Sequence, residues 1–394
     1  MPTKQELQML QALPLDLKIM RTQQRIREWV QYYGTDGVCV SFSGGKDSTV
    51  LLHLVRQIYP NIKAVFSDTG LEYPEIRNFV KSIDNVDWVK PKQSFHQIVL
   101  ECGYPLFSKE ISEAIRYARK IDGGGEGQCY FAKVEFLGQR YKRERNCKTT
   151  ELQKEKVAGF LQGQEDGDKS IFNKEKYLPA CQELPFLIGG QCCNKMKKTP
   201  LSQYGKENRV ATIVGTTAEE SMLRLQGWLK TGCNAFKKGK SQPLSFWKEQ
   251  DILTYIKQNN IKISSIYGDI VSIDKSGGYY EQTLCEAGKL KCTKCSRTGC
   301  MYCAFGAANE HKKLGKSRYE LLAEIHPQIY DYCMRGGEWA DNPYYDETAP
   351  LYDNDGWKNW NPKKIWQPSA TGLGLKYVFQ KVNEIYGKDF IKYE

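Results

Sequence analysis

The chain has 394 residues, of which 40% are hydrophobic and 26% are charged, as in soluble globular proteins. No apolar run approaches the roughly 20 residues that cross a bilayer, and no signal-peptide core is present, so the sequence excludes a membrane partner and predicts a cytoplasmic protein. The net charge of +11 favours an anionic partner, with a solvated basic surface as the alternative. Fourteen cysteines without a secretion signal indicate reduced thiols or metal ligands rather than disulfides.

Helical and strand patterns alternate in the first part of the chain. Apolar spacing predicts an amphipathic helix over residues 16–33, with Asp16 as its cap and Gly34 at its end. The next elements are predicted in the order strand, helix, strand, helix, strand, at residues 37–42, 48–59, 62–67, from Pro74, and 86–91. This alternation predicts an α/β fold, with a parallel sheet covered by helices on both faces.

The character of the sequence changes after this region. Residues 123–179 are rich in glycine, lysine and glutamine with weak periodicity, and we interpret them as an insertion. The α/β pattern resumes with a strand at 210–214 and a helix at 246–260. We therefore predict an α/β domain over residues 1–285 and a smaller, cysteine-rich and mainly helical region over residues 286–394.

A glycine loop, "SGGKDS" at residues 43–48, joins the first predicted strand to the following helix. Glycines let the backbone turn sharply and bring its amides against a ligand, while the helix start adds free N–H groups and partial positive charge. Lys46 adds a full charge, and Ser43 and Ser48 add hydroxyl donors. The pattern is not Walker A, which needs four residues between Gly and Gly-Lys. It predicts a phosphate site, and the alternative is a tight turn capped by Asp47 or Ser48.

The hexapeptide resembles the PP-loop of the adenine-nucleotide alpha-hydrolase-like superfamily, which includes ATP pyrophosphatases and sulfonucleotide reductases. Further segments follow in the order seen in the PAPS reductase family, so the chain is identified as a member of it over most of residues 16–306. These segments are "SDTGLEYPE" (67–75), "FSKE" (107–110), "GTTAEESMLR" (215–224) and "PLSFWKEQDILTYI" (243–256). The resemblance implies a Rossmann-like PP-loop domain.

The resemblance also implies site residues. Lys109 and Arg224 would pair with phosphate or sulfate oxygens, and surface solvation or structural ion pairs are the alternative for both. Thr216 and Thr217 stand where reductases tend to carry arginine, which favours a different substrate. The nucleotide-binding residues would be Ser43, Gly44, Gly45, Lys46, Asp47, Ser48, Asp68, Thr69, Gly70 and Gly215, and the catalytic residues Lys46, Asp47, Lys109 and Arg224.

Two groups of cysteines stand out, the tandem Cys192-Cys193 and the run Cys292-x2-Cys295-x4-Cys300-x2-Cys303. Thiolates at such spacing can converge on one metal, and the second group alone would suit a zinc ribbon. The pattern is similar to APS reductases, to phage and bacterial PAPS-reductase-like proteins, and to ATP pyrophosphatases of DNA phosphorothioation. That resemblance implies a [4Fe-4S] cluster with zinc as the alternative metal. The ligands would be Cys193, Cys295, Cys300 and Cys303, with Cys192 as a close alternative and Cys292 as a spare.

The same resemblance guides the predicted function. Reductases of the family use a C-terminal cysteine, but no cysteine follows Cys333, and the intact SGGKDS is the form associated with ATP pyrophosphate chemistry. We expect an ATP-using, iron–sulfur, sulfur-transfer enzyme that cleaves ATP with Mg²⁺ to AMP and pyrophosphate and adenylylates an acceptor. One alternative is a PAPS or APS reductase that releases sulfite. The other is a non-catalytic accessory protein that binds nucleic acid. The expected partners are an adenine nucleotide and a sulfur donor protein or thioredoxin-like reductant.

Overall fold

The computed structural model describes residues 2–119, 174–273, 279–280, 288–352 and 358–394. Two compact units make up the chain, and each contains two separate segments. Unit 1 comprises residues 1–92 and 196–301, and unit 2 comprises residues 93–195 and 302–394. The domain boundary that the sequence suggests near residue 285 stays a prediction. Most of the predicted insertion at 123–179 lies outside the described residues.

A six-stranded sheet forms the centre of unit 1, in the order β3-β2-β1-β4-β6-β5. All neighbouring strands are parallel except β5, which runs antiparallel to β6. Small and apolar residues make up β1 and β2, and both strands are almost wholly buried, as expected where helices cover a parallel sheet. The strands are β1 (Val38–Ser41), β2 (Ala64–Ser67), β3 (Val86–Val89), β4 (Ala211–Val214), β5 (Asn234–Ala235) and β6 (Lys240–Ser241).

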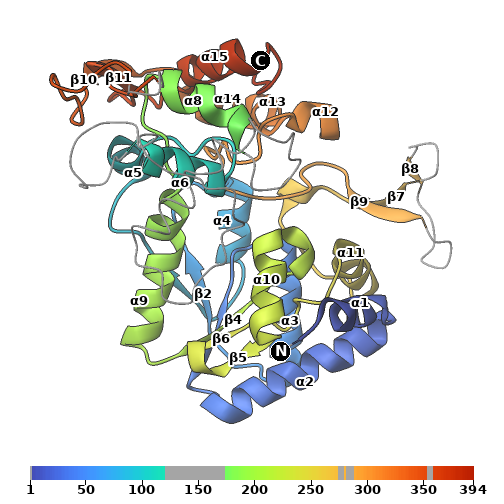
Figure 1. Cartoon of the computed structure of the whole chain (residues 1–394). Helices are drawn as coiled ribbons and strands as arrows, with labels where there is room; N and C mark the ends of the chain where they lie inside the picture. The colour runs from blue at the N-terminus through green and yellow to red at the C-terminus, as the bar shows by residue number, and fades with distance from the viewer. Residues whose placement is uncertain (1, 120–173, 274–278, 281–287, 353–357) are drawn as a thin grey trace. The chain divides into compact units, whose positions relative to one another are not determined.

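Helices cover both faces of this sheet, as the sequence predicts. α3 packs against α2 and α11, whereas α9 packs along β2 and β3. Figure 1 shows α9 on one side of the strands and α3 and α11 on the other. The helices of unit 1 are α1 (Lys4–Ala12), α2 (Leu15–Tyr33), α3 (Lys46–Ile58), α4 (Pro74–Lys81), α9 (Thr199–Glu207), α10 (Met222–Thr231) and α11 (Glu249–Gln258).

The predicted elements agree with these helices and strands to within a few residues, but the predicted cap of the long N-terminal helix is wrong. α2 begins one residue before Asp16, and Pro14 stands at its N-cap position without a side-chain hydrogen bond. Asp16 lies in the first turn, where its negative charge suits the helix dipole. Gly34 ends the helix as expected, and its amide donates to the carbonyl of Val30.

The strand order places a topological switch point between β1 and β4, at the centre of the sheet. From β1 the chain continues to β2 on one side, while β4 pairs with β1 on the other side. Ligands of open parallel sheets bind at such points, outside the carboxyl ends of the strands. The loop at residues 43–48 leaves β1 at this place, and Gly215 follows β4 there. The topology therefore positions the predicted phosphate loop at the expected binding edge.

A second, three-stranded sheet completes unit 1. Its order is β8-β7-β9, with β7 (Ile270–Ile273) paired antiparallel to both β8 (Tyr279–Tyr280) and β9 (Lys289–Cys292). Two short 3₁₀ helices, Ala218–Glu220 and η5 (Ser265–Tyr267), precede α10 and β7. Another 3₁₀ helix lies at Phe236–Lys238.

Unit 2 is mainly helical, in line with the predicted C-terminal region. Its helices are α5 (Phe95–Cys102), α6 (Lys109–Ala118), α8 (Leu178–Glu183), α12 (Glu310–Leu314), α13 (Arg318–Ile325), α14 (Pro327–Met334) and α15 (Leu375–Tyr386), with a 3₁₀ helix at Glu175–Tyr177. The capping boxes Ser94–Gln97 and Ser317–Glu320 fix the starts of α5 and α13. β10 (Glu338–Asp341) and β11 (Lys364–Gln367) form an antiparallel pair.

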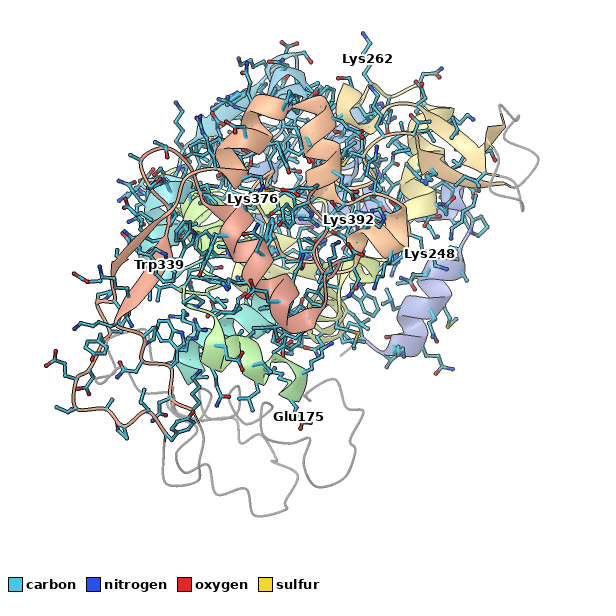
Figure 2. The ribbon with its side chains drawn as sticks, turned by 90° about the horizontal axis from the view of Figure 1, so that it is seen from above. Glu175, Lys248, Lys262, Trp339, Lys376 and Lys392 are labelled. Atoms are coloured by element: carbon cyan, nitrogen blue, oxygen red, sulfur yellow. The ribbon has the colours of Figure 1, made fainter. Side chains whose placement is uncertain are left out.

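The surface of unit 2 carries one aromatic cluster on this strand pair. Trp339 of β10, labelled in Figure 2, is 47% exposed. Its ring packs edge to face against those of Trp366 and Tyr377, at centroid distances of 5.8 and 5.6 Å.

In the part of the chain that the structure describes, no helix is long and apolar enough to span a membrane.

Candidate functional site

The phosphate loop has a backbone that only glycine permits at Gly44. This residue has φ +71°, and a Cβ placed on it would come within 2.8 Å of side chains of Ile76 and Val80. Gly45 is the N-cap of α3 and has no side chain to cap the helix. Instead the Ser48 hydroxyl accepts from the Ser43 amide at 3.2 Å and donates to the Gly45 carbonyl at 2.9 Å. Ser48 thus holds the turn from within, but α3 has no side-chain cap hydrogen bond, so the helix cap expected from Asp47 or Ser48 is not formed.

Lys46, the charged residue of the loop, is 4% exposed and fully occupied by internal partners. Its Nζ donates to the Ser296 carbonyl at 3.0 Å and pairs with Glu249 Oε1 at 3.1 Å. Asp47 Oδ2 lies 3.9 Å away. The ammonium group is therefore stabilised at the sheet edge, but it must leave these oxygens before it can pair with a phosphate.

The Lys46 amide of the loop is also covered. The Lys46 amide donates to the Tyr267 hydroxyl at 3.1 Å, and this hydroxyl lies 2.7 Å from Thr298 Oγ1. Gly44 and Gly45 are buried, whereas Ser43 is exposed. The structure therefore shows the predicted loop in a closed arrangement, with two hydroxyl groups above it.

The segment after β2 places Asp68, Thr69 and Gly70 beside the same edge of the sheet. Asp68 is 6% exposed and accepts from Arg77 at 2.8 Å. The Thr69 amide and hydroxyl donate to the buried carboxylate of Glu72. Gly70 has φ +74°, which favours glycine. The side chains of Asp68 and Thr69 therefore both have protein partners.

Gly215 joins β4 to the phosphate loop by close contact. A Cβ on this residue would lie 3.0 Å from the Asp47 carbonyl oxygen and 3.1 Å from Ser48 Cα. Arg224, in the first turn of α10, pairs with Glu220. Burial lowers the pKa of Arg224, and the nearby Asp47 carboxylate opposes that shift. The structure thus places Gly215 against the Asp47 backbone, and the Asp47 carboxylate close enough to Arg224 to act on its charge.

Lys109 and the tandem cysteines belong to unit 2, and Lys109 forms a hydrogen bond with the residue that follows them. The Lys109 Nζ donates to Asn194 Oδ1 at 3.1 Å, one residue after Cys193. The loop before the cysteines is held by Glu113, which accepts from the Gly190 amide at 3.0 Å. A π-helix, η2 (Asn194–Lys198), follows directly. Such helices are rare and often mark functional sites.

The predicted metal ligands are divided between the units. Cys295 and Cys300 belong to unit 1, whereas Cys192, Cys193 and Cys303 belong to unit 2. Across the described residues, no group of three or more His, Cys, Asp or Glu side chains is arranged to hold a metal. The thiolate chemistry suits an iron–sulfur cluster or zinc, but the geometry of either unit does not form the site, and cluster binding stays a prediction.

Cys295 and Cys300, two of the predicted ligands, each have a polar or charged group beside the sulfur atom. Cys295 is 8% exposed, and its Sγ donates to the Arg297 carbonyl at 2.8 Å. Burial lowers the pKa of Lys197, but Cys300 and Glu72 outweigh it and raise the value. Lys197 also pairs with Glu72 Oε1 at 3.3 Å. A cation thus lies beside the Cys300 sulfur, where it would stabilise negative charge.

The spare ligand, Cys292, lies in β9 and is 3% exposed. Burial raises the pKa of its thiol to about 11, although Lys46 opposes the shift. Cys39 behaves similarly in β1, where burial raises its pKa to about 11. Cys39 is a core residue, with 2% of its surface exposed.

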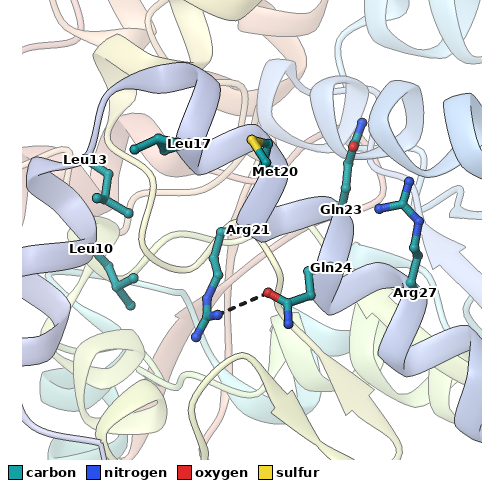
Figure 3. Close-up of a pocket in the computed structure, with 8 residues that line it drawn as sticks. All are labelled: Leu10, Leu13, Leu17, Met20, Arg21, Gln23, Gln24 and Arg27. Atoms are coloured by element: carbon teal, nitrogen blue, oxygen red, sulfur yellow. Dashed lines mark hydrogen bonds between the residues drawn. The ribbon is translucent and has the colours of Figure 1, made fainter.

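A cavity of about 590 Å³ lies elsewhere, between α1 and α2 (Figure 3). Its wall is part apolar and part basic, with a hydrogen bond of 3.1 Å from Arg21 to Gln24. The lining residues are Leu10, Leu13, Leu17, Met20, Arg21, Gln23, Gln24 and Arg27. None of them is a predicted site residue.

Sequence reasoning missed the residues that cover the phosphate loop. Tyr267, Ser296, Thr298 and Glu249 all contact Lys46 or Gly45, yet they lie about 200 to 250 positions later in the chain. No motif in their own segments indicates this contact. The Cys292-x2-Cys295 spacing drew attention to one part of the neighbourhood for metal binding, and the segment at 243–256, which contains Glu249, did so only as a family resemblance.

His53 lies in α3, and its environment gives a test of the fold. Its Nδ1 lies 3.0 Å from the Tyr255 hydroxyl, and burial lowers the pKa of His53 below 6.5. The folded state therefore binds this proton less readily than the unfolded state, so the contribution to stability is present above pH 6.5 and lost as pH falls. Urea unfolding at pH 7.5 and 5.5 should show a smaller loss of stability in His53→Gln than in the wild type. Equal losses would contradict this environment.

Comparisons with known proteins place this chain in a family. The phosphoadenosine phosphosulfate reductase domain matches residues 37–146 and 163–305. A phosphoadenosine 5'-phosphosulfate reductase from Photorhabdus laumondii is 30% identical over 130 residues, which is 32% of this chain and 48% of that protein. One from Xanthomonas axonopodis pv. citri is 35% identical over 74 residues, covering 19% and 30%. The chain thus spans less than half the length of these two relatives.

Solved structures with weaker similarity include the PAPS reductase from Candida auris in its phosphate complex, with TM-score 0.31 and 13% identity over 72% of this chain and 98% of that chain. Another is the U34-tRNA thiolase NcsA from Methanococcus maripaludis with its [4Fe-4S] cluster, with TM-score 0.27, 11% identity and 82% of both chains covered. The family match covers more than half of the chain and includes the phosphate loop, the segment after β2 and Arg224. The chain therefore belongs to the phosphoadenosine phosphosulfate reductase domain family.

Proposed function

We propose that the chain binds an adenine nucleotide at residues 43–48 and cleaves ATP to AMP and pyrophosphate in order to adenylylate an acceptor for sulfur transfer. The observation that carries this proposal is the complete SGGKDS loop at the β1–β4 switch point, with Lys46 at the start of α3. Family membership supports an adenine nucleotide as the ligand.

In the proposed reaction an acceptor oxygen attacks the α-phosphate, and pyrophosphate leaves as the new P–O bond forms. The loop amides and the Lys46 ammonium would offset the charge that develops on the leaving group, an effect that commonly contributes the most to catalysis. Arg224, near Asp47, would neutralise a further phosphate oxygen. A sulfur nucleophile would then displace AMP from the adenylylated acceptor.

A second candidate, reductive cleavage of PAPS or APS with release of sulfite, is supported by the names of the relatives. This reaction needs a thiol that attacks the sulfur of the sulfonucleotide. Cys333, the last cysteine of the chain, is fully buried in α14, and burial raises its pKa. A buried, protonated thiol is a poor nucleophile, so this route needs an external thiol.

The two candidates are separated by their products under anaerobic, reducing conditions. The first predicts pyrophosphate from ATP and Mg²⁺ in the presence of an acceptor, and no sulfite from PAPS with thioredoxin. Sulfite release without pyrophosphate would favour the reductase. Salt-sensitive binding to nucleic acid with turnover of neither nucleotide would instead favour the accessory protein.

A [4Fe-4S] cluster is part of the proposal, with Cys193, Cys295, Cys300 and Cys303 as ligands and Cys192 as the alternative to Cys193. Such a cluster would hold or relay sulfur. Anaerobically purified protein should be brown and contain about four irons, as a Cys₄-ligated cluster requires. Cys300→Ser should lose most of this iron, whereas Cys233→Ser, whose thiol contacts Ser245, should keep it. One zinc per chain, or equal iron in both variants, would contradict the cluster.

A further inference from the structure

The hydroxyl of Tyr267 contacts the backbone of the phosphate loop. It accepts from the Lys46 amide at 3.1 Å and contacts Thr298 Oγ1 at 2.7 Å. A Cβ on Gly45 would lie 3.2 Å from this hydroxyl and 3.4 Å from Thr298 Oγ1. Tyr267 is 2% exposed, so both groups fill the space above the loop.

A second contact engages the charge of the loop. The Lys46 Nζ donates to the Ser296 carbonyl at 3.0 Å, two residues before Thr298. The same ammonium lies 5.9 Å from the centre of the Tyr267 ring. One amide and the one lysine of the loop are thus both bound to groups from residues 267–298.

The residues that contact the loop belong to the 292–301 segment and to η5, which are joined by backbone hydrogen bonds. The amides of Lys294 and Cys295 donate to the carbonyls of Tyr267 and Ile266 at 3.1 and 3.2 Å. At its far end, the Met301 amide donates to the Leu71 carbonyl at 2.8 Å. The 292–301 segment therefore contacts both ligand-binding segments of the sheet edge, after β1 and after β2.

We propose that the contact of Tyr267 and the 292–301 segment with the phosphate loop is autoinhibitory, and that nucleotide phosphate competes with it. A phosphate oxygen bound to the Lys46 amide displaces the Tyr267 hydroxyl, and an ion pair with Lys46 removes the donor from the Ser296 carbonyl. Binding then releases the segment that carries Cys295 and Cys300. The inference rests on the proposed function, because it requires the loop to bind phosphate.

The competition has a direct consequence for affinity. Before a protein molecule can bind phosphate, it must break the hydrogen bond between the Lys46 amide and the Tyr267 hydroxyl. Removing the hydroxyl removes this free-energy cost of binding. One hydrogen bond corresponds to a change in affinity of about three- to tenfold. Phosphate binding and attachment of the 292–301 segment are reciprocally coupled. Bound phosphate must therefore weaken the attachment of this segment to the loop by the same factor by which the segment weakens phosphate binding.

Calorimetric titration with inorganic pyrophosphate and Mg²⁺ tests the first half of the proposal on the full chain. Tyr267→Phe should bind pyrophosphate about three- to tenfold more tightly than the wild type. Thr298→Ala, which removes a hydroxyl of a half-buried residue, should change affinity in the same direction. Tyr255→Phe is the matched control, because this hydroxyl is equally buried but contacts His53 away from the loop.

Hydrogen exchange at the Met301 amide tests the second half. Pyrophosphate should speed this exchange about fivefold or more in the wild type, because local opening sets the exchange rate. Tyr267→Phe should exchange faster even without ligand. Weaker binding by Tyr267→Phe would show that the hydroxyl holds the phosphate and would overturn the proposal.

The outcomes also separate this inference from the proposed function. If pyrophosphate binds the wild type and Tyr267→Phe equally, with Met301 exchange unchanged, the autoinhibitory contact is refuted and the nucleotide site stands. If neither protein nor Thr298→Ala binds pyrophosphate, the phosphate site itself is refuted, and the inference falls with it.

Discussion

Replacing Lys46 with alanine is expected to lower pyrophosphate release from ATP by about 100-fold or more, the usual effect of removing one group that stabilises developing charge. Lys46 is the charged residue of the loop and lies at the start of α3, where its ammonium can reach phosphate oxygens once it leaves Ser296 and Glu249. Initial rates of pyrophosphate formation, measured with saturating ATP, give the comparison.

The matched control is Lys63→Ala in the same unit. Lys63 is 53% exposed and pairs with Asp87 at 3.1 Å, away from the loop, so its loss should leave the rate within about twofold of the wild type, as for most exposed ion pairs. Circular dichroism should show that both variants are folded. A Lys46→Ala protein as active as Lys63→Ala would remove the phosphate loop from the mechanism.

Arg119→Met should lower the free energy of unfolding by about 3 to 5 kcal/mol, because it leaves several buried carbonyl groups without a donor. Arg119 follows α6 and has no exposed surface. Its guanidinium donates to the carbonyls of Cys181, Phe186, Ala180 and Leu184 at 2.6 to 3.0 Å. It also stacks on the Trp360 ring at 4.2 Å, so one side chain joins α6, the α8 region and the C-terminal segment.

Arg335→Met is the control in unit 2. Arg335 is 58% exposed and pairs with Asp331 on the surface of α14, so its loss should cost less than about 1 kcal/mol. Urea unfolding followed by tryptophan fluorescence measures both variants. A loss below about 1 kcal/mol in Arg119→Met would mean that water or local rearrangement satisfies the carbonyls.

Local sequence patterns predicted much of unit 1. Glycine and serine between two apolar runs identified the loop at residues 43–48, because that turn depends on residues next to one another. Alternation of strands and helices identified β1 to β4, and Asp68 and Gly215, which the motifs assign to nucleotide binding, directly follow β2 and β4. These features depend on short-range periodicity and backbone freedom, which a single sequence records.

Contacts between distant segments could not be predicted. Nothing near Tyr267 indicates that its hydroxyl reaches the Lys46 amide, 221 residues away. Asp16 is a residue type that commonly caps helices, but the chain enters α2 through Pro14, and Asp16 lies in the first turn instead. The grouping of residues 93–195 with 302–394 likewise depends on packing between segments that have no common motif.

A crystal structure of the chain with a non-hydrolysable ATP analogue and Mg²⁺ is the most direct test of the nucleotide site. The analogue's phosphates should lie against the amides of residues 44–48, with the Lys46 Nζ moved from the Ser296 carbonyl to a phosphate oxygen and the Tyr267 hydroxyl displaced. An analogue bound elsewhere, with Tyr267 still on the Lys46 amide, would contradict the account.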